Sequence, residues 1–535
     1  MRALLTALCL LLALPVLGVF AAWGGGGLSW STLAHQASTV LPGYLLQSAL
    51  LSVGVALGVI VLGSATAAAV TLFDFPGRRI FEWALLLPMA MPAYVLAYAA
   101  TDALQYSGPL QSALRGWLGV RGALWPDVRS LGGAIVLFVL VLYPYVYLLT
   151  RAALGERTAQ LLEAARLLGA GTRRRLFEVA LPLARPAVAA GVALVVMETL
   201  ADYGVGAYFG LTTFSTGIIK AWLVLEDPAA AAQLALALLA AVALLLWIEK
   251  RSRRRLRFAA SRGGRAADER PPRLHGRVAL AVWLLCALPI LLGFVLPVAW
   301  LLRMAWQEWL FNDFGLPWAR FGGWALASLR LSLLAAALAT ALALAVGFAL
   351  RGAGGRTALA PAARLLSLGY AVPGAVLAVG VLAPVALLQS RWPGLPMSTW
   401  VTGTVLGLMA GYLCRFSAVA LQAVDAGYTR VPINIDESAR LLGAGPRRMF
   451  WQLHLPLLRR SALTAALLVF VDVMKELPAT LMLRPFGSDT LAVVAYNLAR
   501  DERLGEAALP SLAIVAVGLL PVLLLSRAMR VGGGP

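Results

Sequence analysis

The chain has 535 residues, of which 61% are hydrophobic, and its mean hydropathy is +0.82. This apolar share is far above that of soluble globular domains, so the composition excludes a soluble protein and predicts an integral membrane protein. The formal net charge of +20 would suggest nucleic-acid binding in a soluble chain. In a membrane protein, an excess of basic residues is expected in the cytoplasmic loops. We therefore predict that membrane lipid surrounds the chain and that it has no nucleic-acid partner.

Twelve apolar segments are long enough to cross a membrane, which takes about 20 helical residues. The first, MRALLTALCLLLALPVLGVFAAW, has features of a cleaved signal peptide, but its apolar run is long for one, so we expect an uncleaved span. The twelve lie near residues 1–23, 44–72, 80–101, 131–150, 186–206, 229–248, 278–302, 326–350, 365–388, 401–424, 460–482 and 507–526.

The basic residues predict the topology. If the N-terminus starts in the cytoplasm, most Lys and Arg residues fall on the cytoplasmic side, as the positive-inside rule requires. We therefore expect a multi-pass protein of the bacterial inner (plasma) membrane with both termini cytoplasmic. Residues 251–277 would be a basic cytoplasmic linker between a first domain, 1–250, and a second, 278–535; specific lipid or nucleic-acid binding by this linker is the alternative.

Two related segments stand in equivalent places of the two domains. EAARLLGAGTRRRLFEVALP spans residues 163–182, and ESARLLGAGPRRMFWQLHLP spans residues 437–456, 274 positions later (437 − 163 = 274). We call them the first loop and the second loop. Each follows the fourth span of its half and precedes the fifth. Because six spans per half is an even number, the halves form a parallel repeat.

The sequence of each loop predicts a short helix, a sharp turn and a second helix. Gly169 and Gly443 interrupt a run of good helix formers, and an amphipathic helix then restarts, which we expect to lie at the membrane surface and to stop at a Leu-Pro pair. A basic loop obeying the charge rule alone is the simpler alternative. It would not place Phe177 and Trp451 at matching offsets, so we predict a shaped docking surface for a cytosolic partner.

The pattern resembles the EAA loop of ABC-importer permeases, which binds in a groove of a cytosolic ATPase. The resemblance implies an all-α membrane protein with the type I ABC importer permease fold: about twelve transmembrane helices in two parallel six-span repeats. Ser438 replaces the middle alanine in the second loop. The matching residues are Glu163, Ala164, Ala165, Gly169, Leu181 and Pro182 in the first loop and Glu437, Ala439, Gly443, Leu455 and Pro456 in the second.

The resemblance also implies partners. Two copies of a cytosolic ABC ATPase would receive the two loops, and a periplasmic substrate-binding protein would deliver the cargo. The lysines of this chain, Lys220, Lys250 and Lys475, lie outside any G-x-x-x-x-G-K-[ST] phosphate loop. We therefore expect a transport subunit that is no enzyme and binds no cofactor itself, with ATP and Mg on the partner subunit.

The phrase MKELPATLMLRPFGSDTLA, which begins at Met474, resembles the fused permeases of ferric-iron importers. Fused permeases for thiamine or another small solute have the same architecture. The motifs therefore do not decide between iron and such a solute as the cargo. An ion-coupled secondary transporter and a membrane-embedded enzyme are the alternatives of other classes. The first needs no docking loop, and the sequence shows no nucleophile-and-base grouping for the second.

Acidic residues recur at matching depths after both loops. Glu198 and Asp472 lie 16 residues after the Leu-Pro prolines, and Asp202 and Glu476 lie 20 after them. Each pair is spaced i, i+4 on one helix face. Carboxylates so deep in a membrane are usually functional or paired. One hypothesis is a pathway for a hard cation such as Fe³⁺; the other is a structural role at the gate, with Lys475 pairing with Asp472.

The three cysteines and three histidines are scattered along the chain without CxxC pairs or metal-ligand spacing. We therefore assign no disulfide framework and no firm metal site.

Overall fold

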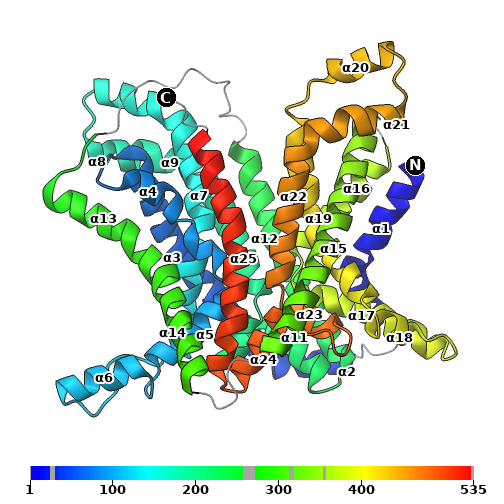
Figure 1. Ribbon diagram of the computed structural model, residues 1–535, viewed down its shortest axis with the longest axis horizontal. Helices are drawn as coiled ribbons and strands as arrows, with labels where there is room; N and C mark the ends of the chain where they lie inside the picture. Colours follow the sequence, from blue (N-terminus) through cyan, green and yellow to red (C-terminus); the bar gives the residue numbers. More distant parts are fainter. Residues whose placement is uncertain (1, 24–29, 257–271, 312–317, 353–356, 532–535) are drawn as a thin grey trace. The chain divides into compact units, whose positions relative to one another are not determined.

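The computed structural model describes residues 2–23, 30–256, 272–311, 318–352 and 357–531 (Figure 1). Within these ranges the chain forms helices, loops and one isolated β-bridge, between Asp74 and Arg273. Ten of the described helices are long and apolar enough to cross a membrane; an eleventh crossing results if Arg78–Ala90 and Ala93–Leu118, bent by 88°, form one broken span. The predicted all-α membrane fold is confirmed.

The remaining predicted span, 460–482, coincides with two helices. These are α22 (Leu455–Lys475) and the short α23 (Pro478–Leu483). Charged side chains distinguish α22 from the ten apolar helices, because it carries Arg459, Arg460, Asp472 and Lys475.

The chain divides into two compact units that are not continuous in sequence. The first-loop unit comprises Pro42–Thr213, Ala240–Leu316 and Leu498–Pro535, and the second-loop unit comprises Met1–Leu41, Phe214–Leu239 and Pro317–Asn497. As compact bodies they differ from the expected domains 1–250 and 278–535, because each takes its first apolar helix from the other half of the sequence. Residues 257–271 of the expected linker lie outside the described residues.

In the first-loop unit, α9 packs along the long helix α7, and α14 packs along α25 (Figure 1). The helical segments of this unit are α3 (Leu41–Leu72), α4 (Arg78–Ala84), η2 (Leu87–Ala90), α5 (Ala93–Leu104), α6 (Pro109–Leu118), α7 (Leu131–Leu167), α8 (Thr172–Arg174), η3 (Arg175–Ala180), α9 (Leu181–Ala201), α10 (Gly204–Tyr208), α13 (Gly276–Ile290), η5 (Leu291–Val295), α14 (Leu296–Phe311) and α25 (Leu504–Val531).

In the second-loop unit, α15, α19 and α22 pack against one another. Its segments are α1 (Arg2–Gly18), η1 (Val19–Trp23), α2 (Trp30–Ser38), α11 (Phe214–Leu223), α15 (Trp318–Arg351), α16 (Leu359–Ser367), η6 (Leu368–Ala371), α17 (Gly374–Arg391), α18 (Met397–Thr402), α19 (Leu406–Tyr428), α20 (Ile433–Leu441), α21 (Pro446–Arg448), η7 (Met449–His454), α22 and α23. Helices α12 (Pro228–Leu256) and α24 (Leu491–Arg500) each contribute to both units.

Small residues let α1 pack closely within the second-loop unit. A Cβ on Gly380 of α17 would collide with the carbonyl oxygen of Pro15, and one on Gly18 would collide with the carbonyl oxygen of Gly380. Close backbone approach through small residues is how helices associate in membranes, where burial of apolar surface supplies little force. The glycines therefore explain why α1 fits against α17.

Candidate functional site

The turn of each loop is a Schellman motif, which ends a helix with a residue in the left-handed conformation. In the first loop Gly169 has φ +81°, its N–H donates to the carbonyl of Arg166 (2.9 Å), and the N–H of Ala170 donates to the carbonyl of Ala165 (2.9 Å). A Cβ on Gly169 would meet nothing within 4 Å. The positive φ, and not lack of space, is what requires glycine here.

The second loop repeats this geometry. Gly443 has φ +77°, its N–H donates to the carbonyl of Arg440 (2.9 Å), and the N–H of Ala444 donates to the carbonyl of Ala439 (3.0 Å). The alanine at the third position of each EAA-like motif, Ala165 or Ala439, thus supplies the carbonyl that closes the turn. The predicted sharp turn is confirmed in both loops. The predicted short helix before it is confirmed in the second loop, as α20, and was wrong for the first loop, where the long helix α7 runs into the turn.

The Leu-Pro pair does not end a helix, and this expectation was wrong. A π-helical turn, Arg175–Ala180 or Met449–His454, runs directly into the transmembrane helix that begins at Leu181 or Leu455. The N–H of each of these leucines closes the π turn on a carbonyl five residues back. Proline is tolerated next because it falls in the first turn of the following α-helix, where an N–H is dispensable.

Exposed leucines follow the helix end in both loops. Leu167 and Leu168 are 83% and 87% exposed, and Leu441 and Leu442 are 89% and 85% exposed. Phe177 and Trp451, at matching positions past the turn, are also exposed. Exposed apolar groups gathered beside arginines are typical of a surface that another protein covers.

The other predicted loop residues surround this surface. Glu437 is exposed and Ala439 is half-buried; the side chain of Glu163 lies outside the described residues. Ala164 is exposed. The residues Ala165, Leu181, Pro182 and Leu455 are half-buried, and Pro456 is exposed.

A buried ion pair holds the second loop and was not predicted from the sequence. Arg351, the last residue of α15, donates to Asp436 at 2.6 Å and to the carbonyl of Pro432 at 2.8 Å. The Arg351 and Asp436 side chains are 12% and 6% exposed. His454 of the π turn is buried, with its Nε2 3.6 Å from Asp436.

The first loop has an apolar cluster at the equivalent place. By the repeat offset, Leu154 is equivalent to Tyr428 (428 − 274 = 154) and Ala180 is equivalent to His454 (454 − 274 = 180). Leu154 and Ala180 are buried together with Ala68 and Ala184. The sequence signal that could have revealed the difference is Asp436 itself, a second acid directly before Glu437, where the first loop has a leucine.

The backbone before the two loops also differs. In the first-loop unit α7 continues without interruption into the loop, whereas in the second-loop unit α19 ends at Tyr428 and a separate helix, α20, carries the motif. Arg351 bonds the carbonyls of Tyr428 and Pro432 across this break. The ion pair therefore anchors α20, which is not a continuation of α19.

The predicted acids that lie 20 residues after the two Leu-Pro prolines cap short helices. Asp202 accepts hydrogen bonds from the N–H groups of Val205 (2.9 Å) and Gly206 (3.4 Å) at the start of α10. Glu476 accepts from the N–H groups of Ala479 (3.0 Å) and Thr480 (2.8 Å) at the start of α23. A carboxylate at a helix N-terminus satisfies free amides and favours the helix dipole.

Glu476 has an additional partner in Arg415, at 3.4 Å, and its side chain is 2% exposed. The other predicted residues, Glu198, Asp472 and Lys475, are half-buried. Among the described residues, no three His, Cys, Asp or Glu side chains gather as a metal site would require.

Comparison with known proteins assigns the chain to a family. Two segments, residues 54–258 and 355–531, match the family model described as binding-protein-dependent transport system inner membrane component. The two matches contain the first and the second loop, respectively.

Relatives with different named cargoes share parts of the sequence. The Fe(3+)-transport system permease protein FbpB 2 of Haemophilus influenzae is 25% identical over 483 residues, which is 89% of this chain and 88% of that protein. The molybdenum transport system permease protein ModB of Escherichia coli K12 is 30% identical over 130 residues, 24% of this chain and 55% of its own length. The putative 2-aminoethylphosphonate transport system permease protein PhnV of Salmonella typhimurium is 29% identical over 168 residues, 31% of this chain and 62% of its own.

Proposed function

Because this chain belongs to the family of binding-protein-dependent transport system inner membrane components, we propose that it is the fused permease of an ATP-driven importer for ferric iron. The observation that carries the transport role is the pair of loops with one turn geometry and the same exposed leucines. Iron is supported by the Fe(3+) permease, whose alignment extends over 89% of the chain, against 24% and 31% for the relatives named for molybdenum and 2-aminoethylphosphonate.

The proposed partners follow from the loops. Each loop binds one of two copies of a cytosolic ATPase, which holds ATP and Mg, and closure of the ATPase pair moves both loops. The rigid turn passes this motion on, because the residues after Gly169 and Gly443 continue as one helical segment into a transmembrane helix. A periplasmic binding protein delivers the cargo from the opposite side.

Uptake of radioactive iron into proteoliposomes tests the cargo. The permease is reconstituted with its partner ATPase and binding protein, and thiamine, molybdate and 2-aminoethylphosphonate are added as competitors. We expect ATP-dependent Fe³⁺ uptake that none of them inhibits. Uptake of a competitor in place of iron would contradict the cargo, and uptake driven by an ion gradient without the ATPase would indicate a secondary transporter.

Co-purification with the ATPase tests the loops. The double variant Leu168→Asp, Leu442→Asp places charges in the proposed contact and is expected to lose the ATPase, because desolvating an unpaired carboxylate is costly. Val224→Asp, at a 69% exposed residue between α11 and α12, is the control and should retain it. Full retention by the double variant would contradict docking through these leucines.

We also propose that Asp202 and Glu476 act as fixtures of the gate and not as iron ligands. Their hydrogen bonds to α10 and α23 support this role, because backbone amides engage Oδ2 of Asp202 and both carboxylate oxygens of Glu476. Asp202→Asn and Glu476→Gln are expected to lower the melting temperature and slow uptake without changing the apparent KM for the iron-loaded binding protein. A raised KM with unchanged melting would favour the pathway hypothesis.

Both termini are proposed to lie in the cytoplasm, which the basic composition of the loops on that side supports. Labelling of single cysteines introduced at Arg2 and in the loop after α6 tests this arrangement with a reagent that does not cross membranes. We expect labelling in intact spheroplasts only at the loop position.

A further inference from the structure

An apolar groove lies in the first-loop unit beside the first loop. It has a volume of about 910 Å³, within the roughly 300–1,000 Å³ of sites that hold small molecules. Its walls come from α3, α9, α12 and α13, which belong to four of the helices apolar enough to span a membrane. A groove so bounded is accessible to lipid within the bilayer.

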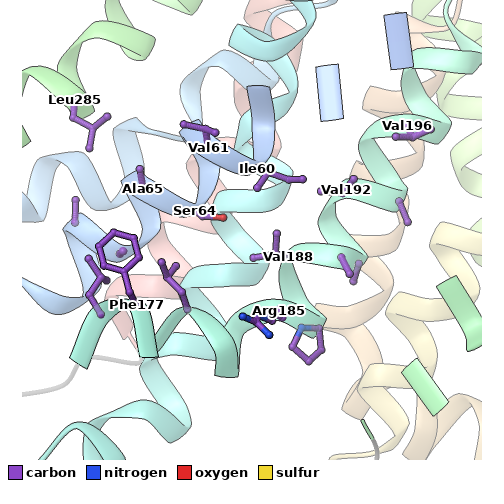
Figure 2. A pocket seen from close by; sticks show the side chains of 18 of the residues that line it. Ile60, Val61, Ser64, Ala65, Phe177, Arg185, Val188, Val192, Val196 and Leu285 are labelled. Carbon is purple, nitrogen blue, oxygen red and sulfur yellow. The ribbon is translucent and has the colours of Figure 1, made fainter. Parts of the chain in front are cut away.

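The lining separates a long apolar part from one charged end (Figure 2). Ile60, Val188 and Val196 are among the apolar residues along the groove, while Arg185 lies on α9 at the lower edge of the groove in the view and Phe177 lines it further to the left. Arg185 is exposed, and no carboxylate of the described residues pairs with it. The groove thus offers hydrocarbon contact along its length and an uncompensated positive charge at its end.

Two further features favour a lipid over a purely apolar occupant. The hydroxyl of Ser64, in the groove wall, is buried without a hydrogen-bond partner among the described residues, so it is available to donate to an ester carbonyl. Phe177 also lines a second hollow, of about 450 Å³, whose other residues are Gly171, Arg173, Arg174 and Glu178. Glu178 pairs with Arg174 at 2.7 Å, so Arg173 is the arginine of this hollow that no carboxylate of the described residues pairs with.

We propose that this groove is a binding site for an anionic phospholipid. An acyl chain lies along α3 and α9, and the phosphate of the headgroup pairs with Arg185. The charge of Arg185 complements an anionic headgroup and gives the site its preference over zwitterionic lipid. Since Phe177 belongs to both the groove and the first loop, the bound lipid contacts the loop directly.

Native mass spectrometry of the delipidated full chain in detergent tests the site, with dioleoyl phosphatidylglycerol and dioleoyl phosphatidylcholine as probes. The wild type is expected to bind phosphatidylglycerol more tightly. Arg185→Ala should weaken that binding about fivefold, the effect of roughly 1 kcal/mol per basic residue near an anionic surface, and leave phosphatidylcholine unaffected. Equal affinity for the two lipids in the wild type would overturn the proposal.

The matched control is Arg459→Ala, the equivalent position of the second half (459 − 185 = 274), which should bind as the wild type does. A loss equal to that of Arg185→Ala would show that binding follows basic charge alone and would overturn the site. Millimolar inorganic phosphate should not displace the lipid; displacement would mean that the site takes a free anion.

A second pair of variants tests the groove itself. Val192→Trp fills it and should reduce binding of both lipids, whereas Val53→Trp, at an exposed residue of α3 outside the groove, should not. Unchanged binding by a Val192→Trp protein that melts as the wild type does would overturn the proposal. Should that variant fail to fold, Ala193→Phe gives the same test with a smaller side chain.

Discussion

Asp436 is a buried carboxylate at the base of the second loop. It lies almost fully buried between Arg351 and His454, and Arg351 also bonds two backbone carbonyls across the break before α20. A buried charge that loses its partner is far more costly than a well-packed apolar group. The equivalent positions of the two halves are therefore packed differently: leucine and alanine fill them in the first half, and a charged cluster fills them in the second.

Replacing Arg351 with alanine leaves Asp436 buried and unpaired. We expect the free energy of unfolding of the second-loop unit to fall by about 3–5 kcal/mol, measured by thermal or denaturant unfolding in detergent. The double variant Arg351→Met, Asp436→Leu should recover most of the loss, because it removes both charges. Arg447→Ala, an exposed arginine of the second loop, serves as the control; an equal loss there would contradict the assignment.

His454 predicts a pH dependence of stability. Burial lowers its pKa below the ordinary value, and Asp436 opposes this only in part. The positive charge of Arg351 also lowers the pKa of His454. The rings of Phe348 and Tyr428 pack against the imidazole ring. The folded chain therefore keeps the ring neutral, and the unfolded chain takes up a proton near pH 6.5.

The stability contributed by neutral His454 is thus fully present above about pH 6.5 and is lost as the pH falls below it. The melting temperature of the wild type should drop between pH 7.5 and pH 5.5 by more than that of His454→Gln, measured in the same detergent. Equal drops in the two proteins would show that other groups cause the change.

At the scale of elements, the loop is a rigid connector. Its turn closes by paired backbone hydrogen bonds, and the π turn joins the exposed surface to the transmembrane helix without a flexible break. π turns are rare and often mark functional segments, because they shift the register of side chains along a helix. Phe177 and Trp451, which lie in these π turns, are therefore continuous with α9 and α22, while the exposed leucines lie before the turn, at the ends of α7 and α20.

The glycine of the turn can be tested against its neighbour. Gly169→Ala forces a side chain into the left-handed conformation, which costs roughly 1–2 kcal/mol, and should reduce ATPase binding about tenfold. Gly171→Ala is the matched control, since its φ is not positive and a Cβ there meets nothing within 4 Å. Binding of the ATPase to the purified permease measures both, and equal effects would contradict a role for the left-handed turn.

At the scale of the whole molecule, each compact unit combines segments from both halves of the sequence. Helix α1 packs on α16 and α17 of the second-loop unit, and α14 packs on α25 of the first-loop unit. Neither unit is therefore complete without helices from the other half of the chain.

Helix α1 offers a direct test of this exchange. Gly380→Leu should displace α1 and lower the melting temperature and yield of the protein, because a side chain there collides with the backbone of Pro15. Gly394→Leu, at a position with nothing within 4 Å, should leave both unchanged. Cross-linking of cysteines placed in α1 and α17 reports the displacement directly, and its persistence in Gly380→Leu would contradict the close packing.

The sequence by itself determined the features that depend on neighbouring residues. Apolar runs of membrane length, the repeat offset of 274, the helix before each turn and the glycine within it were all predictable, because length, propensity and a required φ are local properties. The matched acids were predictable as a pattern as well. Their capping of α10 and α23 was not, because the direction of the following helix was unknown.

Only the tertiary structure decided the rest. The continuation of the helix through Leu181–Pro182, the pairing of Arg351 with Asp436, the exchange of α1 and the groove beside Phe177 all depend on which segments pack together. Arg351 and Asp436 are 85 residues apart, and Pro15 and Gly380 lie still further from each other along the chain. Periodicity and charge in a local window hold no information on such contacts, since close packing between distant helices selects them.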